Sequence, residues 1–245
     1  MTKAEVQLVR SLADKRARTE NGLFVAEGEK LISELRSSHL KIRKIFALEG
    51  VFDGREAETV SERDMERLSL LKTAGNSLAL VEIPRYRLDA GALAGKLTLA
   101  LDDVQNPGNL GTIVRLADWF GITDIVCSET TADCYNPKVI QATMGAILRV
   151  RVHHTDLGRF LAEASQKLPV YGTFLEGDDI YRTELSAEGI VVMGNEGRGI
   201  TPEAARFITR KLFIPPWPAD RRGSESLNVA MATGIICSEF RRRPR

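Results

Sequence analysis

The chain has 245 residues, with 34 Lys and Arg against 33 Asp and Glu, a formal net charge of +1 and 43% hydrophobic residues. These values are ordinary for a globular protein, and the length allows one large domain or two smaller ones. No apolar run approaches the roughly 20 residues that a membrane helix needs, and residues 1–19 lack the apolar core of a secretion signal. We therefore expect a cytoplasmic protein with no membrane partner.

The first 85 residues predict a small α/β domain, followed by a Pro- and Gly-containing linker at 86–96. Ser61 is suited to cap one of its helices, because Asp64 follows three residues later. The predicted helices span residues 4–18, 25–38 and 61–72, and the predicted strands span 41–48 and 77–83.

Residues 97–245 have a different pattern, in which short apolar runs alternate with helix-like stretches. Continuous apolar strands between helices are typical of a parallel sheet covered on both faces. The second domain is therefore predicted to be a Rossmann-like α/β domain. Its predicted strands are 97–104, 124–128, 170–175, 189–194 and 211–215.

A turn rich in Asn and Gly follows the first of these strands, within "LDDVQNPGNLGTIVRLADWFG" (101–121). Asn109 is placed to cap the next helix, and Gly121 to end it. Arg115 falls just off the apolar face of this helix. It is either a solvated surface residue or a group that leans toward the anion-binding start of the helix.

A second turn, "GNEGRG" (194–199), follows the strand at 189–194. It matches neither the dinucleotide fingerprint nor a P-loop, and its glycines allow a ligand to lie against the backbone. Glu196 is a turn carboxylate, or a group that holds Arg115 or a substrate hydroxyl. Thr201 and Pro202 are suited to begin the next helix.

A third turn lies within "IPPWPADRRGSESLNVAMA" (214–232) and leads to a helix predicted at about 226–240. Ser224 or Ser226 is placed to cap that helix. Small residues along it allow another element to pack closely, which plain helix–sheet packing also explains.

These three segments resemble the three motifs of the SpoU (TrmH-like) branch of the SPOUT RNA 2′-O-ribose methyltransferases. The strings "NPGNLGTIVRLADWFG", "GNEGRG" and "SLNVAMA" stand in the family order, and the resemblance covers roughly 97–240. Residues 10–40 also resemble the substrate-binding domain that precedes the catalytic domain in many members. The chain departs from the usual pattern at Asn106, at Ala230 and in the long stretch 216–225.

The resemblance implies a C-terminal trefoil knot in the catalytic domain (97–245) and a ribosomal-protein-like (L30e-like) fold for an RNA substrate-binding domain (1–85). It implies S-adenosylmethionine as cofactor, and a homodimer formed through the methyltransferase domain. By position, the implied catalytic residues are Asn109, Arg115, Glu196, Ser226 and Asn228, and the implied cofactor-binding residues are Thr173, Gly194, Asn195, Ile214 and Leu227.

The function implied is S-adenosylmethionine-dependent methylation of a ribose 2′-hydroxyl, in ribosomal RNA rather than transfer RNA. A non-catalytic RNA-binding protein of the same fold is the main alternative, and a Rossmann-type oxidoreductase is a weaker one. Arg115 is either the general base or, because arginine stays protonated, a phosphate clamp that stabilises the alkoxide.

Two features of composition complete the prediction. Residues 1–44 carry ten basic against six acidic side chains, and residues 206–245 carry nine against three, which would suit RNA phosphates if both lie on one face. A solvated surface, with 241–245 as a frayed tail, is the simpler explanation of the same charges. Cys127, Cys134 and Cys237 complete no metal-ligand spacing, so we expect buried thiols and no metal site.

Overall fold

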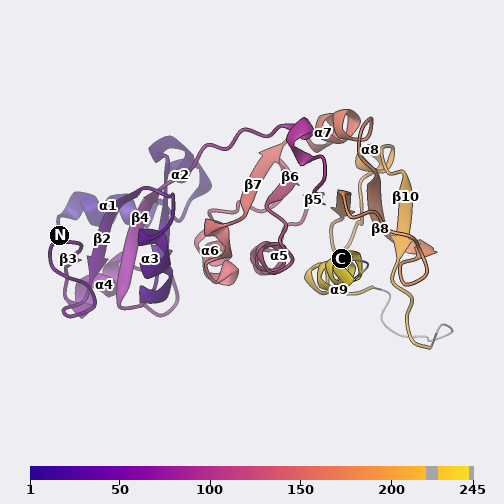
Figure 1. Ribbon diagram of the computed structural model, residues 1–245. Helices are drawn as coiled ribbons and strands as arrows, with labels where there is room; N and C mark the ends of the chain where they lie inside the picture. The colour runs from indigo at the N-terminus through magenta and orange to yellow at the C-terminus, as the bar shows by residue number, and fades with distance from the viewer. Residues whose placement is uncertain (219–225, 243–245) are drawn as a thin grey trace. The chain divides into compact units, whose positions relative to one another are not determined.

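The computed structural model describes residues 1–218 and 226–242 (Figure 1). Packing divides the chain into two compact units. The N-terminal unit comprises Met1–Arg85 together with Asp133–Leu148, and the second unit comprises Tyr86–Ala132 and Arg149–Arg245. The sequence predicts a single boundary near residue 86, whereas the structure assigns 133–148 to the N-terminal unit.

The N-terminal unit is built on a four-stranded sheet of order β1-β4-β2-β3. Strand β4 runs antiparallel to both of its neighbours, and β3 runs parallel to β2. Apolar side chains of the sheet and of α1 and α4 form its core. The elements are α1 (Lys3–Ser11), α2 (Lys15–Asn21), β1 (Leu23–Glu27), α3 (Glu29–Arg36), β2 (Ile42–Ala47), β3 (Glu58–Thr59), α4 (Glu62–Leu68), β4 (Ser77–Glu82), α6 (Pro137–Thr143) and the 3₁₀ helix η2 (Ala146–Leu148).

A buried ion pair joins residues 133–148 to the rest of this unit. Arg18 is 2% exposed, and its guanidinium donates to the Asp133 carboxylate, at 2.9 Å from Nε, and to two backbone carbonyls. The ring of Tyr135 lies 4.9 Å from that of Phe24. A guanidinium taken out of water needs such partners, so this contact fixes where the segment packs.

Two predicted helices of the N-terminal unit have different bounds in the structure. The sequence predicts one helix over 4–18, but the chain turns after α1, and Asp14 caps a separate helix α2. The predicted helix at 25–38 begins only at Glu29, because residues 23–27 pair with β4 as a fully buried strand. Ser61 caps α4 and accepts from the Asp64 amide, as predicted.

The second unit contains a six-stranded sheet of order β10-β8-β9-β5-β6-β7, in which every neighbouring pair is parallel. The predicted parallel α/β sheet is therefore confirmed. The elements are η1 (Ala90–Leu93), β5 (Leu97–Leu101), α5 (Pro107–Trp119), β6 (Asp124–Ser128), β7 (Arg151–Thr155), α7 (Leu157–Ala164), β8 (Val170–Asp179), β9 (Gly189–Met193), α8 (Pro202–Ala205), β10 (Arg210–Phe213) and α9 (Val229–Arg242).

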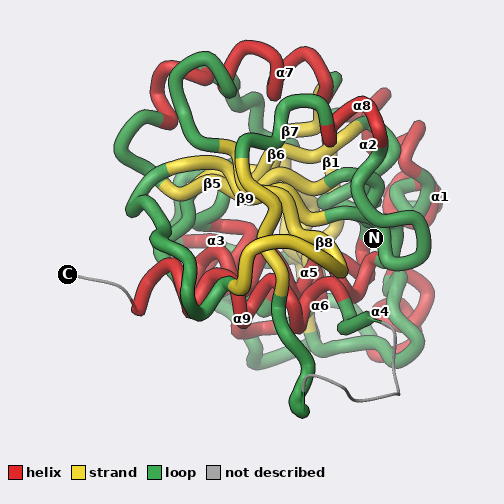
Figure 2. Tube along the Cα trace, turned by 90° about the vertical axis from the view of Figure 1, so that its right-hand side faces the viewer, coloured by secondary structure: helices red, strands yellow, loops and turns green. Residues whose placement is uncertain are grey.

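Helices cover both faces of this sheet (Figure 2). Apolar residues of α7, α8 and η1 pack on one face in a common core with β5, β6, β8 and β9. Helices α5 and α9 pack against each other on the opposite face. Because all six strands are parallel, their carboxyl ends lie on the same side of the sheet, between the two helical layers.

Strand β7 is not predicted from the sequence, because "RVHHT" carries an arginine and two histidines and is not an apolar run. His153 is nevertheless buried, and its ring bonds to the Asp124 carboxylate at 3.0 Å. None of the helices in the described part of the chain is both long and apolar enough to cross a membrane.

Candidate active site

The three turns singled out in the sequence meet at the carboxyl edge of the six-stranded sheet. The first turn follows β5, the second follows β9, and the third follows β10. Strands β9 and β5 are neighbours, and only β8 separates β9 from β10. Because parallel strands all end at the same edge, segments about 100 residues apart in sequence come together there.

The first turn begins helix α5 three residues earlier than the sequence predicts. Asn106 is the cap, and its side-chain oxygen accepts from the amides of Gly108 (2.8 Å) and Asn109 (3.1 Å). The prediction that Asn109 caps this helix is therefore wrong. Because Asn106 is the cap, the side-chain amide of Asn109 is available for other contacts. Gly121 follows the C-cap with φ of 66°, as predicted.

Asn109 joins all three turns through two hydrogen bonds. Its side-chain nitrogen donates to the Glu196 carboxylate at 2.6 Å, and its oxygen accepts from the Asn228 side chain at 3.0 Å. Glu196 and Asn228 are exposed, and Asn109 is half-buried. The structure thus brings together three of the five predicted catalytic residues, one from each motif, in a polar chain open to solvent.

Asn228, rather than a serine, caps helix α9. Its side-chain oxygen accepts from the amides of Ala230 (3.0 Å) and Met231 (3.3 Å). The predicted cap Ser226 has no hydrogen-bond partner among the described residues, and the other predicted cap, Ser224, lies outside them. Asn228 therefore both begins α9 and bonds to Asn109.

The second turn, residues 194–199, is closed by its own hydrogen bonds. The backbones of Asn195 and Gly199 exchange two bonds of 3.0 and 2.9 Å, and the Asn195 side-chain oxygen accepts from the amides of Gly197 and Arg198. Thr201 then caps α8 with Pro202 at its first position, as predicted. Glu196 bonds to Asn109 and not to Arg115.

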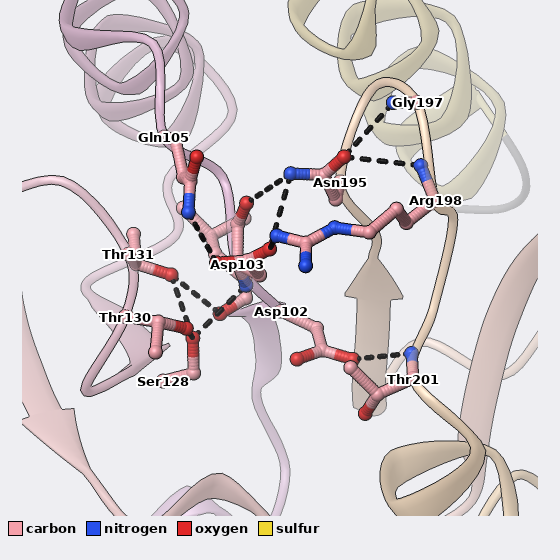
Figure 3. Close-up of polar contacts among 11 residues, drawn as sticks. Asp102, Asp103, Gln105, Ser128, Thr130, Thr131, Asn195, Gly197, Arg198 and Thr201 are labelled. Atoms are coloured by element: carbon pink, nitrogen blue, oxygen red, sulfur yellow. Dashed lines mark hydrogen bonds and ion pairs between the residues drawn. The ribbon is translucent and has the colours of Figure 1, made fainter.

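Two residues that the sequence interpretation missed fasten this turn to the first one (Figure 3). Asp102 and Asp103 follow β5 and are 4% and 6% exposed. The Asp102 carboxylate accepts from the Thr201 amide at 2.7 Å, and the Asp103 carboxylate accepts from the Asn195 side chain at 3.1 Å and pairs with Arg198. Two consecutive carboxylates directly after a buried strand were the available signal.

Arg115 lies on the exposed surface of α5. Its guanidinium has no hydrogen-bond or ion-pair partner in the part of the chain that the structure describes. Helix α5 therefore presents a positive group with all its donors available. An arginine in this state is suited to bind an anion from outside the chain.

Of the predicted cofactor positions, Gly194 and Ile214 directly follow β9 and β10, Thr173 lies within β8 between these two strands, and Leu227 lies two residues before α9. The pairing of β8 with β9 ends at Gly172, and the hydroxyl of the next residue, Thr173, donates to the Val192 carbonyl at 3.2 Å. Ile214 follows β10 and is half-buried, and Leu227 is 52% exposed. The Asn195 side chain is bonded to Asp103 and to the turn, and its backbone N–H and C=O are both bonded to Gly199.

Within residues 1–218 and 226–242, no group of three or more His, Cys, Asp or Glu side chains is placed to hold a metal ion. The cysteines Cys127, Cys134 and Cys237 are buried, and none of them is joined in a disulfide bond. Burial raises the pKa of the Cys127 thiol and raises that of Cys237 to about 12, so these two sulfurs are not nucleophiles at neutral pH.

Known proteins are similar to this chain in sequence and in structure. The 23S rRNA (guanosine(2553)-2′-O)-methyltransferase RlmP of Bacillus subtilis is 29% identical over 240 residues, which cover 95% of this chain and 94% of that protein. The structure of a putative RNA methyltransferase of the TrmH family from Porphyromonas gingivalis superposes with a TM-score of 0.89 at 36% identity, covering 100% and 99% of the two chains. An AdoMet-bound rRNA methyltransferase from Sinorhizobium meliloti gives 0.83 at 29% identity, covering 99% and 95%.

Two family models divide the chain between them. The model of the MRM3-like substrate binding domain matches residues 3–84. The model of the SpoU rRNA Methylase family matches residues 96–238, which include all three turns and the polar chain that joins them. The chain belongs to the SpoU rRNA methylase family.

Proposed function

We propose that this protein is an enzyme that uses S-adenosylmethionine to methylate a ribose 2′-hydroxyl in ribosomal RNA. The observation that carries the proposal is the polar chain from Glu196 through Asn109 to Asn228, which ties the three family motifs into one site. The family match and the rRNA 2′-O-methyltransferase relative support the same reaction. We call the side chains of Glu196, Asn109 and Asn228 the motif triad.

The residues at the strand ends fit S-adenosylmethionine. The half-buried Ile214 and the exposed Leu227 offer apolar surface to an adenine ring. The second turn offers the backbone of Gly194, directly after β9, and Thr173 lies in the adjacent strand β8. The AdoMet-bound relative of the same fold supports this choice of cofactor. When bound, S-adenosylmethionine supplies an electrophilic methyl group on its sulfonium.

Arg115 is suited to act on the RNA rather than on the cofactor. Transfer to a ribose requires the hydroxyl to be held in line with the methyl group and to lose its proton. An exposed guanidinium without an internal partner binds the phosphate beside the target ribose and stabilises the developing alkoxide. The motif triad, with Ser226 two residues before Asn228, orients the ribose.

Other features of the family are part of the proposal. Residues 1–85 act as an RNA substrate-binding domain with an L30e-like fold, 86–96 as a linker, and 97–245 as the catalytic domain. A trefoil knot in the catalytic domain is also part of the proposal, and the match to the SpoU rRNA Methylase family supports it.

A homodimer formed through the methyltransferase domain is also part of the proposal. Trp119, at the end of α5, is 84% exposed, and Met231, on α9, is 64% exposed. Apolar side chains of this size on two packed helices are suited to contact a second copy of the chain. Light scattering at micromolar concentration tests it, with twice the chain mass expected. We place the protein in the cytoplasm, where ribosomal RNA is available to it.

The test of the function is transfer of tritium-labelled methyl groups to ribosomal RNA from cells that lack this gene. We expect labelling by the wild-type protein, mapped to a ribose by a reverse-transcription stop at low nucleotide concentration. The variant Arg115→Ala is the control for contaminating activity.

Two other outcomes would reassign the protein. If a transfer RNA mark disappears in the deleted strain while ribosomal RNA stays intact, the substrate is transfer RNA. If calorimetric titration with S-adenosylmethionine gives no saturable heat while RNA still binds, the chain is a non-catalytic RNA-binding protein.

A further inference from the structure

Asp103 combines burial with an unusual backbone conformation. It lies directly after β5, is 6% exposed and has φ of 60°. That left-handed conformation is uncommon for residues other than glycine and persists only where surrounding contacts enforce it. The hydrogen bonds of Asp103 indicate why the chain adopts this conformation.

All the polar groups of Asp103 are bonded, and most of these bonds lead to the second turn (Figure 3). Its amide donates to the Ser128 hydroxyl at 2.9 Å, and its carbonyl accepts from the Asn195 side chain at 2.8 Å. One carboxylate oxygen accepts from Gln105 at 2.9 Å, and the other accepts from Asn195 at 3.1 Å and from the Arg198 guanidinium. Charge-assisted bonds of this kind are among the stronger ones in proteins.

The second turn is therefore anchored at both of its ends to one buried carboxylate. The Asp103 side chain is 9% exposed, whereas that of Arg198 is 71% exposed, so a buried carboxylate binds an exposed arginine. Glu196 lies between the two anchor residues Asn195 and Arg198. Its carboxylate is the group that reaches Asn109 at 2.6 Å.

We propose that Asp103 is a positioning residue for Glu196. Through Asn195 and Arg198 it holds the second turn where Glu196 meets Asn109 and completes the motif triad. The catalytic consequence of this inference rests on the proposed methyltransferase function, whereas the mechanical part, the hold on the turn, does not.

The test uses two variants and one matched control. Asp103→Gly removes the carboxylate and accepts φ of 60° without strain, and Arg198→Gln breaks the same ion pair from its exposed side. Asp124→Asn is the control, because Asp124 is a carboxylate 5% exposed that pairs with a half-exposed arginine, Arg151. It lies at the amino end of β6, on the edge of the sheet opposite the second turn.

The first measurement is hydrogen–deuterium exchange of the peptide that contains residues 194–201. The amides of Gly197 and Arg198 are bonded to the Asn195 side chain, which Asp103 holds. We expect both amides to exchange at least tenfold faster in Asp103→Gly and in Arg198→Gln, and at the wild-type rate in Asp124→Asn. Unchanged exchange in both test variants would overturn the proposal, whatever reaction the protein catalyses.

The second measurement is a double-mutant cycle on methyl transfer with Glu196→Gln. We expect Asp103→Gly to lower kcat at least tenfold with less than a threefold change in the KM for S-adenosylmethionine. Adding Glu196→Gln to Asp103→Gly should lower kcat by less than a further twofold, because Glu196 is already displaced. In the Asp124→Asn background, Glu196→Gln should have its full effect.

The outcomes separate this inference from the proposed function. If the effects of Asp103→Gly and Glu196→Gln multiply, Asp103 acts independently of Glu196 and the positioning role is wrong. If the wild-type protein transfers no methyl group, the proposed function fails, and the exchange measurement alone decides whether Asp103 holds the turn. If Asp103→Gly does not fold, Arg198→Gln replaces it in both measurements.

Discussion

The three glycines of the second turn should respond very differently to replacement by alanine. A Cβ atom added at Gly194 would overlap the carbonyl carbon of Gly199 and lie 2.6 Å from its oxygen. A Cβ at Gly199 has open space, but φ there is 70°, which a side chain tolerates poorly. A Cβ at Gly197 meets only the Asn195 side chain, at 3.7 Å.

These geometries give an order of magnitude for each variant. At Gly194 the obstructing atoms are backbone of the same turn, so alanine must distort it, at about 1–3 kcal/mol by analogy with overpacked cores. At Gly199 the left-handed conformation costs about 1–2 kcal/mol. At Gly197 we expect no loss, and a gain of up to about 1 kcal/mol is possible through the unfolded chain. For a chain of this length, 1 kcal/mol corresponds to roughly 2–4 °C in Tm.

Thermal unfolding of the three single variants tests this order, with Gly197→Ala as the internal control. We expect the Tm of Gly194→Ala to lie several degrees below that of Gly197→Ala. Equal Tm values for these two variants would refute the reasoning. The result also bears on the cofactor pocket, because a bulky residue at Gly194 displaces the turn itself, and loss of S-adenosylmethionine binding in Gly194→Val would not locate the cofactor.

Three further predictions follow from other parts of the structure. Arg115→Ala should change the free energy of unfolding by no more than about 0.5 kcal/mol, because the side chain has no partner among the described residues, yet lower turnover at least 100-fold; near-normal turnover would defeat its proposed role. Burial opposes ionisation of Asp124, but hydrogen bonds from His153, Arg151 and Thr123 outweigh it and hold the pKa of this carboxyl well below its usual range. The ionised Asp124 carboxylate therefore stabilises the folded protein fully above the unfolded pKa of about 3.9, and this stabilisation is lost as the pH falls below that value. The difference in the free energy of unfolding between wild type and Asp124→Asn should accordingly shrink in acid. A constant difference from pH 6 to 2 would contradict this. Native protein at pH 8 should react with a disulfide reagent at fewer than one of its three cysteines per chain, and at all three after unfolding, because all are buried; rapid native reaction would contradict the burial.

The strands of the second unit could largely be predicted from sequence, because apolar runs bounded by Gly and Pro are a local signal. Strand β6 has the predicted bounds of residues 124–128. Strand β7 could not be predicted, because the polar His153 is buried through its contact with Asp124, and that contact depends on tertiary structure. The first residue of α5 was predicted wrongly for a related reason. Both Asn106 and Asn109 are good caps, and only the packed turn decides between them.

The members of the motif triad could be identified from the resemblance, but the bonds between them could not. Asn109 reaches Glu196 and Asn228 because Asn106 takes over the cap. The paired carboxylates Asp102 and Asp103 mark the end of β5, but the sequence does not indicate the role of Asp103, which comes from its backbone conformation and from partners more than 90 residues away. Local patterns therefore indicated the site, and long-range contacts determined its geometry.

The charge of the N-terminal unit shows how sequence contiguity can mislead an argument about RNA binding. Residues 1–44 alone are strongly basic, but residues 1–85 carry 15 Lys and Arg against 14 Asp and Glu, and 133–148 add one of each sign. The whole unit has a net charge of +1, because the basic stretch folds with an acidic one.

Several of those basic groups are also taken up inside the unit. Arg18 is buried on Asp133, and Lys44 pairs with Glu5 and Glu58. Among the described residues, Lys15, Lys30 and Lys41 have no ion-pair partner. An electrostatic contribution to RNA binding must come from such unpaired side chains, since counterion release depends on the phosphates actually contacted and not on the charge of a sequence segment.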